Sequence, residues 1–229
     1  MSHRAVLFDV GGPIDLEFAW EIAVDSAIAS ACGLEGIRVD QDMIDQASEA
    51  AVAAFAPDAY AFMIEHLCGG DHATTARVTS RRRAMVDGLD VFQMRPDMPA
   101  LLRRLADRGL RLGIVANQPA RMSERLGREG IADLFAHLGL TGLTGLRKPD
   151  PRAFMTACDA LGVRPAEAIM VGDRIDVDIA PAKALGMAAI LLRSGRHRRQ
   201  RPRSPADEPD AVVTDVLELE AAITSLLSS

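Results

Sequence analysis

Short apolar runs alternate with helical patterns along most of this chain, and the alternation limits the folds open to it. Four such runs end in a polar or glycine-containing turn: residues 4–9, 110–115, 168–172 and 188–192. Helical patterns follow them at residues 97–108, 120–129, 151–162, 177–185 and 215–227. Strands separated by helices form βαβ units around a parallel sheet. We therefore predict an α/β fold, a Rossmann-like parallel sheet with helices on both faces, with further short strands near 136–140 and 211–213.

Residues 16–90 depart from this alternation, because their pattern is helical throughout. Helical periodicity recurs in four segments: Phe18–Cys32, Gln41–Phe55, Ala59–Leu67 and Thr74–Val86. We predict a small all-helical domain at residues 16–90, inserted into a core domain made of residues 1–15 and 91–229. Its candidate polar contacts with a ligand are His66, His72 and the run Arg81-Arg82-Arg83, although such residues are more often solvated or structural.

The composition is that of an ordinary globular protein, with 48% hydrophobic and 25% charged residues among 229. A net charge of −6 argues against nucleic acid or an anionic membrane as the main partner. The three cysteines, Cys32, Cys68 and Cys158, have no zinc spacing and are expected to be buried free thiols. The N-terminus shows no signal-peptide pattern, so we expect a cytoplasmic protein.

One strongly basic segment stands out, Arg196 to Arg203, with the sequence RHRRQRPR. It follows a predicted strand and is followed by Pro205 and Pro209. We expect it to be a solvated loop, with an anionic-partner surface as the less favoured alternative.

Polar residues follow three of the predicted strands. Asp9 precedes a Gly11-Gly12 turn, Asn117 follows Ala116, and Asp173 follows Gly172. The carboxyl ends of parallel strands meet at one edge of a sheet, where α/β proteins bind ligands. We therefore expect these side chains to lie close together. Asn117 could instead cap the helix that follows it.

Lys148 lies in the segment Arg147-Lys148-Pro149-Asp150-Pro151, whose two prolines stiffen the chain before a helix. Only two lysines occur among the 26 Lys and Arg residues, so composition rarely places a lysine here. A rigid lysine at the edge of the sheet can neutralise a carboxylate and a phosphate oxygen together. We predict a catalytic role for Lys148.

The segment after Gly172 carries three carboxylates, Asp173, Asp176 and Asp178. Magnesium prefers oxygen ligands and is commonly bound by one or two carboxylates together with substrate phosphate. We predict that Asp173 binds such an ion directly and that Asp178 supports it through water or as an orienting partner. Asp176 and Asp178 could exchange roles. Acidic residues also complement a helix N-terminus, which accounts for Asp176 well.

The order of these four segments resembles the motifs of the haloacid dehalogenase superfamily, whose members include forms with a helical cap after the first motif. The resemblance covers nearly the whole chain. It implies that Asp9 is a nucleophile forming an aspartyl-phosphate and that Lys148 and Asn117 bind the phosphate. It further implies that Mg2+ is held by Asp9, Asp173, Asp178 and the backbone carbonyl of Gly11. The expected activity is hydrolysis of a small phosphorylated metabolite, with the cap excluding water.

Two positions depart from the phosphatases of that superfamily. Gly11 replaces the usual second aspartate, which acts as general acid and base, and Ala116 replaces a hydroxyl residue. Loss of general acid–base help typically costs about 10²–10⁴-fold in rate. We therefore predict weakened or restricted activity, least impaired on acyl and aryl phosphates because their leaving groups need no proton.

The glycine at position 11 raises three other possible functions. The first is a catalytically weak or inactive protein that binds a ligand or another protein. The second is a 2-haloacid dehalogenase, whose relatives lack that aspartate but do not use magnesium. A phosphonoacetaldehyde hydrolase would need a cap lysine, and residues 16–90 contain none. The sequence therefore excludes the phosphonoacetaldehyde hydrolase mechanism. It does not determine the oligomeric state.

Overall fold

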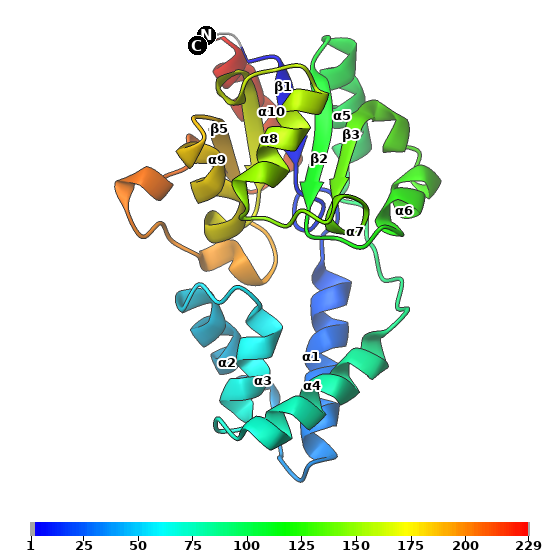
Figure 1. The fold of residues 1–229 in the computed structure, drawn as a ribbon, viewed down its shortest axis with the longest axis vertical. Helices are drawn as coiled ribbons and strands as arrows, with labels where there is room; N and C mark the ends of the chain where they lie inside the picture. The colour runs from blue at the N-terminus through cyan, green and yellow to red at the C-terminus, as the bar shows by residue number, and fades with distance from the viewer. Residues whose placement is uncertain (1–2, 229) are drawn as a thin grey trace. The chain divides into compact units, whose positions relative to one another are not determined.

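The computed structural model of the chain describes residues 3–228. It divides into two compact units, drawn in Figure 1. One unit comprises Met1–Leu16 and Met94–Ser229, and the other comprises Glu17–Gln93.

The first unit contains a six-stranded parallel sheet in the order β3-β2-β1-β4-β5-β6. Every residue of the two central strands, β1 and β4, is buried, as expected for strands covered on both faces. All six strands agree with the apolar runs of the sequence. Their bounds are β1 Ala5–Phe8, β2 Arg111–Ala116, β3 Phe135–Leu140, β4 Ala168–Gly172, β5 Ala188–Leu192 and β6 Ala211–Val213.

Helices cover both faces of this sheet, which confirms the predicted α/β class. Helix α8 packs on β2 and β3 and contacts α9, whereas α5 packs on β2 and contacts α10. Figure 1 shows α8 and α9 on the near side of the sheet. The helices of this unit are α5 Met98–Asp107, α6 Met122–Arg128, α7 Thr141–Thr144, α8 Pro151–Ala160, α9 Ala180–Ala184 and α10 Val216–Leu227.

The second unit is built from four helices: α1 Phe18–Gly33, α2 Gln41–Ala53, α3 Ala59–Leu67 and α4 His72–Val86. Three of them begin at an aspartate whose carboxylate accepts a backbone N–H of the first turn: Asp40 for α2, Asp58 for α3 and Asp71 for α4. Helix α1 packs on α4, and α2 packs on α3, around a shared apolar core.

The cysteines are buried free thiols, as the sequence indicates. Within the residues described, none of the helices combines the length and the apolar character that crossing a membrane would require.

Candidate active site

Asp9 and Asp173 come together because β1 and β4 are neighbouring parallel strands that end side by side. Phe8 is paired with Val171, and the Asp9 backbone N–H donates to the Val171 carbonyl at 2.9 Å. Glycine makes the close approach feasible. A Cβ on Gly12, whose φ is +79°, would lie 2.7 Å from Asp173 Cβ, and one on Gly172 would lie 2.3 Å from Asp178 Cβ. Both turns therefore need a residue without a side chain.

Lys148 is buried between two carboxylates. Its Nζ lies 2.9 Å from Asp9 Oδ2 and 2.6 Å from Asp178 Oδ1. Asp178 is itself fully buried, and its Oδ2 accepts the Arg174 backbone N–H at 3.0 Å. The lysine and both carboxylates are thus held in one arrangement by direct bonds.

Asn117 holds the backbone of Lys148. Its Nδ2 donates to the Lys148 carbonyl at 3.0 Å, and its Oδ1 accepts the Lys148 N–H at 2.9 Å. This pair of bonds fastens the segment after α7 to the end of β2. The structure therefore gives Asn117 a positioning role that sequence reasoning did not identify. Its predicted contact with substrate phosphate stays a prediction.

Burial dominates the electrostatics of this cluster. It raises the pKa of Asp9 from 3.8 to about 6, against the attraction of the Lys148 charge. Burial also works to lower the pKa of Lys148, but the charges of Asp178 and Asp9 outweigh it and raise that pKa above 10.5. Lys148 therefore stays protonated at neutral pH, where Asp9 is mostly ionised.

Three carboxylates meet here with the chemistry of a cation site. Asp9, Asp173 and Asp178 each offer an oxygen atom, and these atoms all lie within 4.8 Å of one another. Clustered carboxylate oxygens are the donor set that a hard divalent cation such as Mg2+ prefers, so the residues present fit that ion. Gly11 lies in the buried turn after Asp9, where its backbone forms a bridge to Asp15.

Asp176, which sequence reasoning could not separate from Asp178, points elsewhere. Its Oδ2 lies 2.5 Å from Arg174 Nη2, and its Oδ1 accepts from Gln200 Nε2 at 3.1 Å. The chain from Ile175 to Ile179 forms a turn of π-helix, which puts Asp178 rather than Asp176 beside Lys148. Turns of this kind often occur at functional sites.

The basic segment Arg196–Arg203 is not a fully solvated loop, so that expectation was wrong in part. Gln200 is buried, and its Oε1 accepts the Ile175 N–H at 2.7 Å. His197 Nδ1 lies 4.0 Å from Asp173 Oδ2, and burial lowers the pKa of His197 to about 3. The segment packs on the aspartate loop because its one amide side chain satisfies buried polar groups there. Several of its arginines remain exposed, as expected.

Arg95 is a second buried residue that sequence reasoning missed. Its Nε donates to the carbonyls of Gly12 and Pro13 at 3.0 and 3.1 Å, and its Nη2 donates to Ser194 Oγ at 2.7 Å. It thus ties the turn after Asp9 to the end of β5. No local pattern around Arg95 predicts these contacts. Gly12 lies 83 residues before it in the sequence, and Ser194 lies 99 residues after it. The lone glutamine within an arginine run was the only available signal for Gln200.

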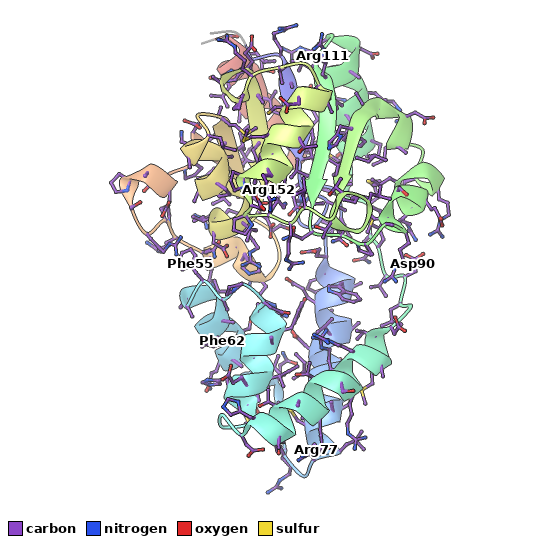
Figure 2. The ribbon with its side chains drawn as sticks, in the orientation of Figure 1. Phe55, Phe62, Arg77, Asp90, Arg111 and Arg152 are labelled. Atoms are coloured by element: carbon purple, nitrogen blue, oxygen red, sulfur yellow. The ribbon has the colours of Figure 1, made fainter. Side chains whose placement is uncertain are left out.

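Figure 2 shows the side chains of both units, with Arg111 and Arg152 labelled in the α/β unit and Phe62 and Arg77 in the helical unit. Arg152 lies on the first turn of α8, two residues after Asp150, with which it pairs at 2.5 Å. This exposed pair is separate from the buried cluster around Lys148.

Known proteins resemble this chain in sequence. It is 30% identical to the N-acetylmuramic acid 6-phosphate phosphatase of Pseudomonas putida over 230 residues, which cover 99% of each chain. It is 36% identical over 132 residues to the glyceraldehyde 3-phosphate phosphatase of Methanopyrus kandleri, covering 57% of each. A phosphoserine phosphatase of Thermus thermophilus is 36% identical over 129 residues, 56% of this chain and 50% of that protein. The matches thus span only about half the length of these last two relatives.

Solved structures share the fold. A protein described as a predicted phosphoglycolate phosphatase from Haemophilus somnus superimposes with a TM-score of 0.73 at 19% identity, covering 96% of this chain and 98% of its own. A HAD phosphatase from Thermococcus onnurineus superimposes with a TM-score of 0.62 at 25% identity, covering 95% and 96%.

The family match extends over most of the chain. Residues 3–186, which include Asp9, Asn117, Lys148, Asp173 and Asp178, match the family described as haloacid dehalogenase-like hydrolase. Together with the parallel sheet and the full-length relative, this match identifies the chain as a member of the haloacid dehalogenase-like hydrolase family.

Proposed function

We propose that this chain is a magnesium-dependent phosphatase that hydrolyses a small phosphorylated metabolite through an aspartyl-phosphate on Asp9. The observation that carries the proposal is the buried Lys148, bonded at once to Asp9 and Asp178 beside Asp173. The phosphatase names of the relatives support the substrate class. The helical unit, expected from the sequence at residues 16–90 and comprising Glu17–Gln93 in the structure, would serve as the cap over the substrate.

In the proposed reaction Asp9 acts as the nucleophile. In the first step, an Asp9 oxygen forms a bond to phosphorus while the bond from phosphorus to the leaving oxygen breaks, and the leaving oxygen keeps the electron pair. In the second step, water attacks the aspartyl-phosphate, releases inorganic phosphate and restores the Asp9 carboxylate. The hydrogen bond from the Val10 N–H to Asp9 Oδ1, 2.7 Å long, orients the carboxylate for attack by its other oxygen.

Lys148 supplies a fixed positive charge in both steps. It is protonated because two carboxylates raise its pKa, and its position is set by Asn117 and Asp178. A charge held in place before the reaction stabilises the charge that develops on the phosphoryl oxygens without further reorganisation. Preorganised electrostatics of this kind is usually the largest contribution to catalysis.

Asp9, Asp173 and the Gly11 carbonyl would hold Mg2+, with Asp178 supporting through water or by its bond to Lys148. When bound, the ion would neutralise phosphate charge and orient the phosphoryl group. The three carboxylates carry more negative charge than Lys148 offsets, which favours a cation at this place.

Gly11 restricts this chemistry to substrates that need little leaving-group protonation. A glycine has no group to donate a proton, so the leaving oxygen must depart as an anion or take its proton from water. Acyl and aryl phosphates tolerate this best, because their leaving groups are weakly basic. Alkyl phosphates are expected to be slower by about 10²–10⁴-fold than with an acid in place.

The direct test measures magnesium-dependent release of phosphate from acetyl phosphate and an aryl phosphate. We expect turnover by the wild-type chain and a loss on the order of 10⁴-fold or more in Asp9→Asn, because the amide is a poor nucleophile. Turnover that survives in Asp9→Asn would rule out the covalent mechanism. No turnover in either protein would indicate a ligand- or protein-binding function. Chelator-insensitive release of halide from 2-chloropropionate would indicate a dehalogenase.

The variant Gly11→Asp tests the role of the missing acid. If the other residues are in place, an added carboxylate two residues after Asp9 should raise alkyl-phosphate hydrolysis, by up to about 10²-fold, with little gain on acetyl phosphate. Gly11→Asn is the matched control, because it adds similar volume without a titratable group. Equal gains in both variants would contradict proton transfer as the limiting factor.

A further inference from the structure

Helix α4 carries an arginine on its buried face. Its three buried residues are Val78, Arg82 and Val86, spaced four residues apart so that they share one side of the helix. The two valines belong to the apolar core of the helical unit. Arg82 is only 8% exposed, whereas its neighbours Arg81 and Arg83 are exposed. A position that the helical pattern assigns to an apolar residue is thus held by a charged one.

The contacts of the Arg82 guanidinium are few. Its carbon lies 5.8 Å from the centroid of the Tyr60 ring on α3, a cation–π arrangement. Its Nε is buried and has no hydrogen-bond partner within the part of the chain that the structure describes. The Asp58 carboxylate attracts the charge, but its Oδ1 is occupied in capping α3, where it accepts the Ala61 N–H at 3.0 Å.

Other arginines of the protein show how such a group is ordinarily satisfied. Buried Arg95 donates to two carbonyls and a hydroxyl. Exposed Arg77 and Arg81 both bind Glu35, at 2.8 and 3.1 Å. A buried N–H without an acceptor, such as the Nε–H of Arg82, costs free energy, and a bound ion is one of the ways in which such a group is satisfied. Burial lowers the pKa of Arg82, yet a guanidinium stays charged at neutral pH.

We propose that Arg82 and Tyr60 form an anion-binding site within the helical unit, which takes a compact oxyanion such as a carboxylate or phosphate group. The planar guanidinium can donate two parallel N–H bonds to a pair of oxygens, while the ring of Tyr60 covers its face. Tyr60 is only partly buried and packs against the apolar core of the helical unit. The ligand is a free anion taken from solution, so the site does not depend on the proposed phosphatase function.

Trp20 provides a readout confined to this unit. It is the single tryptophan of the chain and packs against the apolar core that contains Val78 and Val86. Its fluorescence therefore reports on the helical unit of the full-length protein. Succinate is a suitable probe because it supplies carboxylates and has no phosphoryl group to be hydrolysed. Inorganic phosphate serves as the second probe.

The titration compares the wild-type chain with Arg82→Met and with Arg83→Met, an exposed neighbour on the same helix. We expect saturable binding of at least one probe to the wild type and to Arg83→Met, and an affinity at least tenfold weaker in Arg82→Met. Arg82→Lys keeps the charge but loses the fork, so its affinity should lie between them. Circular dichroism checks that each variant is folded. Equal affinities in Arg82→Met and Arg83→Met, or no binding by the wild type, would overturn the site.

Discussion

The two units each bury a cation, and they hold it in different ways. Lys148 in the α/β unit is bonded to two carboxylates, and its backbone is fastened by Asn117. Arg82 in the helical unit has an aromatic ring over its guanidinium and an Nε with no hydrogen-bond partner among residues 3–228. Both side chains are more than nine-tenths buried. The first charge is satisfied by the fold itself, whereas the second is satisfied only in part.

This difference determines what each residue contributes to stability. Removing one partner of a buried ion pair leaves the other charges uncompensated, which costs much more than the pair gains. Removing a charge that the fold does not satisfy relieves a penalty instead. The two cations therefore offer a direct test of which buried charges the protein needs in order to fold and which it keeps for binding.

The largest effect is expected from Lys148→Met. It leaves Asp9 and Asp178 buried with their main counter-charge gone, so we expect a loss of about 3–5 kcal/mol in the free energy of unfolding at neutral pH. Arg82→Met, by contrast, should change that free energy by less than about 1 kcal/mol or increase it. Urea denaturation in the absence of magnesium measures both. Equal losses in the two variants would mean that Arg82 is a structural residue.

A smaller loss is expected from Asn117→Ala. The substitution removes the two hydrogen bonds that fasten the Lys148 backbone, worth about 1–3 kcal/mol in total. If positioning of Lys148 matters for the reaction, kcat should fall with little change in KM. Asn117→Asp keeps the oxygen that accepts the Lys148 N–H. It should therefore retain about half of the free energy that the two hydrogen bonds contribute. A rise in KM alone would instead support the predicted phosphate contact.

Gln200→Ala tests the attachment of the basic segment to the aspartate loop. It leaves the buried Ile175 N–H without its acceptor, which should cost about 1–2 kcal/mol. Because Gln200 holds the loop that carries Asp173 and Asp178, we expect weaker magnesium binding, measured by calorimetry. The exposed neighbour Arg201 is the control, and Arg201→Ala should leave both quantities unchanged. Identical magnesium affinities in the two variants would show that the loop needs no such support.

The smallest effect is expected in the pH dependence of magnesium-induced stabilisation. Asp9 has a pKa of about 6 in the fold, above its ordinary 3.8. The folded state without metal therefore binds a proton more readily than the unfolded state, and this contribution to stability is lost as the pH rises through about 6. Protons also compete with the cation, so Mg2+ should raise Tm more at about pH 7 than at about pH 5, corresponding to about tenfold tighter binding. In Asp9→Asn this dependence should disappear.

Much of the fold could be predicted because the burial pattern is local. The strands of the sheet are covered on both faces, so they appear in the sequence as continuous apolar runs such as Ala5–Phe8 and Ala168–Gly172. Helix α4 shows the limit of such patterns. Its arginine run is exposed at Arg81 and Arg83 and buried at Arg82, and only the packing of α3 against α4 reveals this.

The candidate site divides in the same way. The topology of a parallel sheet brings residues after β1, β2 and β4 to one edge, so the proximity of Asp9 and Asp173 follows from their place in the sequence. The choice of Asp178 over Asp176 beside Lys148 depends on a single turn of π-helix. The contacts of Arg95 and Gln200 join segments that no local periodicity relates.

By itself, the sequence determined the class of fold and the run of helical segments inserted after the first strand, because both depend on hydrophobic periodicity. It also determined the residue types available for chemistry, which depend on side-chain identity. Only the tertiary structure decided which charges are paired, which are left partly satisfied, and which distant residues hold the loops. Those properties arise from desolvation and hydrogen-bond geometry, which exist only once the chain has folded.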